Sequence, residues 1–179
     1  MAGAIKILPH YTYEDYVQWE GKWELIDGIP YAMSPAPTPK HQLIANNLGS
    51  LFYIALKNCT LCKAYQAIDY KITEDIIIQP DISILCKEAK KNFIDFPPAL
   101  VVEILSPSTA LKDRHTKFYM YQEQQIKYCL LVSPDTEEIE IFELDGHKYV
   151  LKEMGKNFSY TFKFETDCTA TISFGEIWK

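Results

Sequence analysis

Two nearly continuous apolar runs, each interrupted by one carboxylate, constrain this chain of 179 residues more than any other feature. Residues 76–85 read Ile-Ile-Ile-Gln-Pro-Asp-Ile-Ser-Ile-Leu, and residues 97–105 read Pro-Pro-Ala-Leu-Val-Val-Glu-Ile-Leu. Such runs are typical of strands buried on both faces. A buried carboxylate is costly unless it is paired, protonated or bound to a metal. If the two strands are neighbours, Asp81 and Glu103 can therefore converge on one hard cation with oxygen ligands.

The order of elements around these runs predicts an α/β fold. The predicted helices lie at 11–20, 41–57 and 110–124. The predicted strands lie at 23–26, 29–33, 64–73, 76–85, 98–105, 127–133, 137–144, 148–153 and near 169–174. Asp27-Gly28 is a strong signal for a hairpin turn. On the last helix we expect Leu111, His115, Phe118 and Tyr119 on one face. A sheet with helices on both faces accommodates this order.

Charge narrows the class of function. The net charge is −6, whereas a protein that only coats nucleic acid would usually be basic. This balance does not argue against a metal nuclease, because such an enzyme holds phosphate through the metal and a few local cations.

Cysteine content and apolar patterning bear on the compartment. The five cysteines include Cys59-Thr60-Leu61-Cys62, but no second pair follows that would complete a zinc site. We therefore expect reduced or buried thiols and a cytoplasmic protein. No apolar run approaches the ~20 residues of a membrane span. Residues 1–6 also lack the apolar stretch of a secretory signal.

Several motifs resemble the PD-(D/E)xK nuclease superfamily, and within it the Uma-type family of restriction-endonuclease-like proteins. The central match is Gln79-Pro80-Asp81 followed by Val101-Val102-Glu103-Ile104-Leu105. The supporting matches are 13–16, 23–28, 33–35, His41, 98–109, Asp113, Lys117, Tyr121 and Tyr128. The resemblance runs from about residue 11 to about residue 145.

This resemblance implies a restriction-endonuclease-like α/β fold. It would have a mixed central sheet flanked by helices, an N-terminal hairpin and a C-terminal β-meander. We expect a single domain over residues 1–179, with the nuclease core at about 11–145 and a C-terminal β extension at about 146–179. The implied activity is Mg²⁺- or Mn²⁺-dependent hydrolysis of phosphodiester bonds in nucleic acid. DNA is the expected substrate, and relatives commonly act as homodimers.

The resemblance also assigns roles to residues at the metal. Asp81, Glu103 and the main-chain carbonyl of Ile104 would bind it. The superfamily pattern places a lysine two residues after the glutamate, where this chain has Leu105. In the Uma-type branch the lysine has moved to the following helix, which makes Lys117 the candidate.

Further candidates lie outside these strands. Asp113, Lys117 and Tyr121 are four apart and should line one stripe of a helix. Glu24 would tune the metal site from nearby, and His41 and Tyr121 are candidate substrate contacts.

Other interpretations remain open. Lys117 could be a surface lysine, Glu24 an exposed hairpin residue, and His41 a structural or solvated histidine at a helix start. The whole chain could be a nuclease-fold binding or assembly module without cleavage, which Leu105 and the acidic charge favour. A weaker alternative is a small-molecule hydrolase or binding protein that uses the same pocket.

Overall fold

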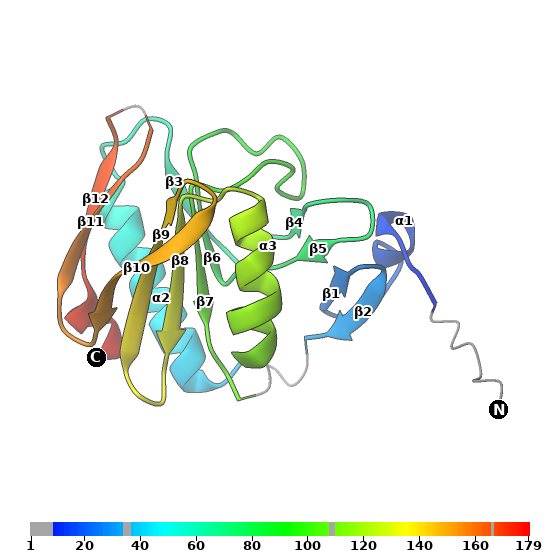
Figure 1. Cartoon of the computed structure of the whole chain (residues 1–179), viewed down its shortest axis with the longest axis horizontal. Helices are drawn as coiled ribbons and strands as arrows, with labels where there is room; N and C mark the ends of the chain where they lie inside the picture. Colours follow the sequence, from blue (N-terminus) through cyan, green and yellow to red (C-terminus); the bar gives the residue numbers. More distant parts are fainter. Residues whose placement is uncertain (1–8, 34–36, 108–109, 166) are drawn as a thin grey trace.

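The computed structural model describes residues 9–33, 37–107, 110–165 and 167–179. Within these residues the chain forms three layers around a mixed sheet (Figure 1). The helices are α1 (Tyr13–Tyr16), α2 (Pro39–Ala55) and α3 (Phe118–Glu123). A π-helical segment, η1 (Lys112–Lys117), leads directly into α3, and a 3-10 turn, η2 (Phe174–Trp178), lies near the C-terminus.

The central sheet has six strands in the order β10-β9-β8-β7-β6-β3. These strands are β3 (Lys63–Gln66), β6 (Ile82–Leu85), β7 (Leu100–Ile104), β8 (Tyr128–Ser133), β9 (Glu138–Asp145) and β10 (Lys148–Gly155). β7 and β8 run parallel and the other neighbours antiparallel. α2 and the C-terminal hairpin pack on one face of this sheet, and α3 packs on the other.

Two smaller sheets complete the fold. One has the order β2-β1-β5-β4, formed by β1 (Trp23–Ile26), β2 (Ile29–Ala32), β4 (Tyr70–Lys71) and β5 (Ile77–Ile78). The other pairs β11 (Ser159–Lys163) with β12 (Thr169–Ser173). The predicted fold class is confirmed, including the hairpin that turns at Asp27-Gly28, where both residues have positive φ, 52° and 72°.

Several predicted elements need correction. The runs 64–73 and 76–85 are each split, because β3 and β6 belong to the central sheet while β4 and β5 belong to the second one. Pro80 lies at the second break, and its missing N–H cannot join a ladder. The predicted helix at 11–20 is only the single turn α1. The strand β11 was not predicted, although Tyr160 and Phe162 alternate with polar residues.

The buried face of the last helical segment also differs from the predicted one. Leu111 and Tyr119 are 79% and 59% exposed, and His115 is exposed as well. The buried side chains are instead Asp113, Lys117 and Tyr121, because the charged ones find partners inside the protein. Some predictions fall on residues 1–6, 34–35 and 108–109, which lie outside the described residues.

The prediction of reduced or buried thiols holds for Cys129, which is free and buried, and is wrong for the other four cysteines. All five cysteines lie in the described part of the chain, and four of them form the disulfides Cys59–Cys168 and Cys62–Cys86. Cys62 and Cys86 continue the β3–β6 ladder by one step, and Cys168 lies between β11 and β12. The partners are 109 and 24 residues apart, so local spacing could not reveal them. No described helix is both long and apolar enough to cross a bilayer.

Candidate active site

Asp81 lies directly before β6, beside the end of β7 that carries Glu103. The β6–β7 pairing extends to Ile82 opposite Val102, which places Asp81 next to the segment Val102 to Ile104. The N–H of Asp81 donates to Val102 O at 3.1 Å, and Asp81 Oδ2 accepts from the N–H of Ile104 at 2.7 Å. The structure thus brings the two carboxylates together at one end of these strands.

His41 reaches the same place from the first turn of α2. Its backbone N–H donates to the N-cap Thr38 side chain at 3.2 Å, which fixes the start of the helix. Its Nε2 lies 3.4 Å from Asp81 Oδ2, and the ring also hydrogen-bonds to the backbone of Ile104. Burial lowers the pKa of His41, but the bond and the charge of Asp81 outweigh burial and raise it. His41 therefore contacts Asp81 and Ile104, two of the three residues predicted to hold a metal.

Lys117 is buried among carboxylates and is not a surface lysine. Its Nζ lies 2.6 Å from Glu103 Oε1 and 2.9 Å from Glu24 Oε1. Asp113 Oδ1 is 3.7 Å away, and the carbonyl of Gln79 accepts from Nζ at 3.2 Å. Burial lowers the pKa of Lys117, but Glu103, Glu24 and Asp113 outweigh it and hold the pKa well above its ordinary value. Lys117 is therefore a permanent ammonium at the centre of the cluster.

Glu24 is fully buried, which excludes the exposed-hairpin interpretation. Besides Lys117 it binds Lys112, and its Oε1 accepts from the N–H of Gln79 at 3.0 Å. Burial raises the pKa of Glu24, but Lys117, Lys112 and the Gln79 bond outweigh it and lower the pKa to about 2. Glu24 thus joins the N-terminal hairpin to the segment just before α3.

Tyr121 lies beneath the cluster. It is fully buried, and its hydroxyl donates to Glu103 Oε1, the oxygen that Lys117 also contacts. This position does not suit the predicted contact with substrate, and it suits orientation of Glu103. Burial raises the pKa of Glu103 well above its usual range, with Asp113, Asp81 and Glu24 adding to the effect and Lys117 opposing it. Leu105 packs in the hydrophobic cluster that contains Tyr121.

The π-helical segment explains how two lysines reach one carboxylate. Lys112 and Lys117 are five residues apart, and in an α-helix they would point about 140° away from each other. The i→i+5 bonds of a π-helix widen the turn and bring such residues closer to one side. The N–H of Phe118 accordingly bonds to Asp113 O.

Sequence reasoning did not assign roles to Lys112, Asp69 or Tyr16. Asp69 accepts from the Gln79 side chain at 2.8 Å and from the Tyr16 hydroxyl at 2.9 Å. These bonds brace the segment that carries Asp81. Tyr16 lies in a matched motif, whereas Asp69 carries no local signal at all.

The donor set fits a magnesium-type cation. Four carboxylates, Glu24, Asp81, Glu103 and Asp113, lie among two lysines and one histidine, so the cluster offers several oxygen ligands. The described residues contain no preformed group of three or more His, Cys, Asp or Glu that could hold a metal ion. Mg²⁺ is usually bound through one or two carboxylates, with water and substrate phosphate completing its shell. The residues present are those that such an ion requires.

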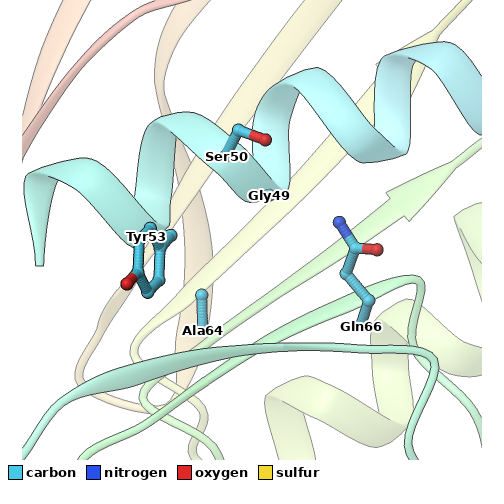
Figure 2. A pocket seen from close by; sticks show the side chains of 5 residues that line it. All are labelled: Gly49, Ser50, Tyr53, Ala64 and Gln66. Carbon is cyan, nitrogen blue, oxygen red and sulfur yellow. The ribbon is translucent and has the colours of Figure 1, made fainter.

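The open pockets lie elsewhere. The pocket in Figure 2 is lined by Gly49, Ser50, Tyr53, Ala64 and Gln66, between α2 and β3. None of these is a predicted site residue.

The fold and the acidic cluster together define a nuclease-like α/β protein with a lysine supplied from a helix. Residues 13–166 match the Uma2 family, described as "Putative restriction endonuclease", and the chain belongs to this family. The resemblance noted from the motifs is thereby confirmed.

Individual relatives agree with this assignment. The chain is 34% identical over 143 residues to a protein of Synechocystis sp. described as uncharacterized, covering 75% of this chain and 74% of that protein. It also resembles the crystal structure of a "putative nuclease belonging to DUF820" from Anabaena variabilis. That likeness has a TM-score of 0.74 at 16% identity and covers 93% of this chain and 97% of the other, so it shows a shared fold.

Proposed function

We propose that this protein is a metal-dependent endonuclease that hydrolyses phosphodiester bonds, with DNA as its substrate. The observation that carries the proposal is that Asp81, just before β6, accepts from the N–H of Ile104, the neighbour of Glu103 on β7, while Lys117 Nζ lies 2.6 Å from Glu103 Oε1. Family membership supports the reaction class.

Asp81, Glu103 and the carbonyl of Ile104 would hold Mg²⁺ or Mn²⁺. When bound, the metal polarises the scissile phosphate and lowers the pKa of a water molecule. Lys117 and Tyr121 both contact Oε1 of Glu103, so a cation could be held through the other oxygen, Oε2. Asp81 keeps its orientation through the Ile104 N–H.

The remaining residues orient and balance the site. Lys117 would orient the attacking water or offset charge that builds on the phosphate. Glu24 holds Lys117 and Lys112 in place through an ion pair with each of them. His41 is the group best placed to meet the substrate, because it is 12% exposed beside Asp81, which is 24% exposed.

The test compares cleavage of single- and double-stranded DNA and of RNA by wild type, Asp81→Asn and Glu103→Gln, with Mg²⁺ or Mn²⁺. Asparagine keeps an oxygen to accept the Ile104 N–H and removes only the charge. We expect both variants to lose about 100-fold or more in cleavage rate. Asp95→Asn is the matched control, because Asp95 is half-exposed and pairs with Lys91 in a loop.

Calorimetric titration with Mg²⁺ and Mn²⁺ completes the test. Wild type and Asp95→Asn should bind the metal, and Asp81→Asn should not. A wild-type protein that binds DNA but neither binds metal nor cleaves would establish the alternative, a nuclease-fold binding or assembly module. If Asp81→Asn and Glu103→Gln instead cleave as fast as wild type, cleavage does not depend on these carboxylates and the proposed site is wrong.

The cytoplasmic location stays a prediction, and the two disulfides count against it because cytosolic proteins rarely keep such bonds. We further propose that the protein works as a homodimer. Light scattering after size-exclusion chromatography tests the dimer, and a mass of one chain at working concentration would refute it.

A further inference from the structure

A second pocket, of about 270 Å³, lies at the C-terminal end of α2, and two disulfides border it. Its lining residues are Tyr53, Leu56, Lys57, Cys59, Cys62, Lys63, Ala64 and Tyr65. Tyr53 and Ala64 also line the pocket shown in Figure 2, so the two hollows adjoin. One cysteine of each disulfide, Cys59 of the first and Cys62 of the second, therefore lines this pocket.

The two disulfides differ in how a thiol could reach them. Cys59 is half-buried where it lines the pocket, and its partner Cys168 is 6% exposed. Cys62, which also lines the pocket, is 1% exposed, and its partner Cys86 is half-buried but does not line the pocket. Access from this pocket therefore differs between the two disulfides. Thiol–disulfide exchange depends on access to the attacked sulfur. Cys59 is therefore the sulfur that a small thiol can attack from this pocket.

Charge around the pocket favours an anionic thiol. Lys57 and Lys63 both line it and are exposed, and no acidic residue is among its lining in the described part of the chain. Nearby ammonium groups favour the thiolate, which is the form that attacks a disulfide. They also attract carboxylates on the incoming molecule. The adjoining strand β3 is an edge of the central sheet, so its outer backbone groups can pair with a short peptide.

We propose that this pocket is a thiol-exchange site, at which a small anionic thiol opens Cys59–Cys168 while Cys62–Cys86 stays closed. The thiolate attacks Sγ of Cys59 and forms a mixed disulfide, and the Cys168 thiolate leaves and takes a proton from solvent. A second thiolate attacks the sulfur that the first thiol contributed, and the Cys59 thiolate leaves and is protonated. Two thiols are oxidised to one disulfide, and one protein disulfide is reduced to two thiols.

Opening this bond would remove the covalent link between the C-terminal hairpin and the end of α2. Cys168 lies between β11 and β12, and Cys59 lies just beyond α2, so the bond joins these elements covalently. The hairpin would then be held without a covalent bond, by packing of residues such as Phe162 and Ile172 in the core and by the hydrogen bond from the N–H of Lys163 to the Tyr128 hydroxyl.

The experiment starts from oxidised, folded protein and uses reduced glutathione as the anionic thiol and 2-mercaptoethanol as the neutral one. Reaction is stopped at intervals by alkylation, and peptide mass spectrometry scores each cysteine. With glutathione we expect Cys59 and Cys168 to be alkylated on the order of tenfold sooner than Cys62 and Cys86, with a transient glutathione adduct on Cys59.

A charge variant tests the pocket itself. Lys57→Gln/Lys63→Gln should lower the glutathione rate several-fold and leave the 2-mercaptoethanol rate unchanged, and added salt should shrink the difference. Lys148→Gln/Lys152→Gln on β10 removes the same charge from another surface and should change neither rate.

Four results would overturn the proposal. The first is equal rates of reduction for both disulfides, and the second is reduction that occurs only in denaturant. The third is a ratio of glutathione rate to 2-mercaptoethanol rate that the Lys57/Lys63 variant leaves unchanged, or that the β10 variant lowers equally. The fourth is free thiols at all four cysteines in the protein before any thiol is added. None of these readouts depends on nuclease activity.

Discussion

Glu24 is fully buried yet keeps its charge, because two ammonium groups and the Gln79 N–H surround it. Its pKa falls from 4.5 to about 2 on folding. A lowered pKa means that ionisation of Glu24 stabilises the fold fully above about pH 4.5, and that this contribution is lost as the pH falls through about 2. The shift corresponds to about 3 kcal/mol.

Glu24→Gln should therefore lose about 3 kcal/mol of unfolding free energy at pH 7, and the gap to wild type should narrow between pH 4.5 and pH 3. Urea unfolding at several pH values measures this gap. Glu88→Gln, at an exposed loop position, serves as the control and should track wild type throughout. A gap independent of pH would show that the glutamine disturbs packing rather than charge.

At the same scale, the sequence could identify Asp81, Glu103 and Lys117 as site residues, but it could not show the contacts that His41 and Tyr121 make. Asp81 and Glu103 stand out because each is the single carboxylate of an apolar strand, and Lys117 follows from its place in the next helix. The contact of His41 with Asp81 joins α2 to a segment forty positions away, and no local pattern encodes it. The orientation of Tyr121 toward Glu103 likewise needed the packing of the helix on the sheet.

Among the elements, η1 most directly sets the geometry of the cluster. An α-helix over Lys112–Lys117 would turn Lys112 away from Glu24, since it and Lys117 would diverge by about 140°. Deletion of the exposed Thr116 removes one residue from the wide turn and should convert it to α-helix. The deletion also leaves Lys112 and Lys117 four residues apart, about 40° from each other on an α-helix, so both should still reach Glu24. We therefore expect the deletion variant to remain folded by circular dichroism and to change stability by less than about 0.5 kcal/mol.

Urea unfolding measures the stability of the deletion variant, and Lys112→Gln, which removes the ammonium that pairs with Glu24, should lose about 2 kcal/mol. If the deletion costs as much as Lys112→Gln, an α-helical four-residue spacing cannot bring both lysines to Glu24 and the wide turn is required.

The periodicity of apolar residues predicted an element well where the whole apolar run forms a single helix or a single strand. It predicted poorly where one run is divided between two sheets. The α2 helix, β7 and β8 follow directly from their apolar patterns. The run 76–85 looked like one strand because its apolar residues continue through Pro80, yet β5 and β6 pair in different sheets. The buried face of η1 was missed because buried Asp113 and Lys117 look like solvent-facing residues until their partners are known.

On the scale of the whole molecule, the two disulfides fasten regions that differ widely in sequence separation. Cys59–Cys168 spans 109 residues, whereas Cys62–Cys86 spans 24. The C-terminal region is also held without a covalent bond, since the Asn47 side chain donates to the carbonyls of Ile177 and Lys179. Trp178 donates to the carbonyl of Lys156.

If restriction of the unfolded chain dominates, removal of each disulfide costs a few kcal/mol, and the larger loop matters more. The ratio of loop lengths makes Cys59→Ser/Cys168→Ser about 1 kcal/mol more destabilising than Cys62→Ser/Cys86→Ser. Urea unfolding without reductant compares the two double variants, and treatment of wild type with excess reductant provides the reference in which both bonds are open. The reverse order would mean that packing around Cys62 and Cys86, at the junction of β3 and β6, outweighs the entropy of the longer loop.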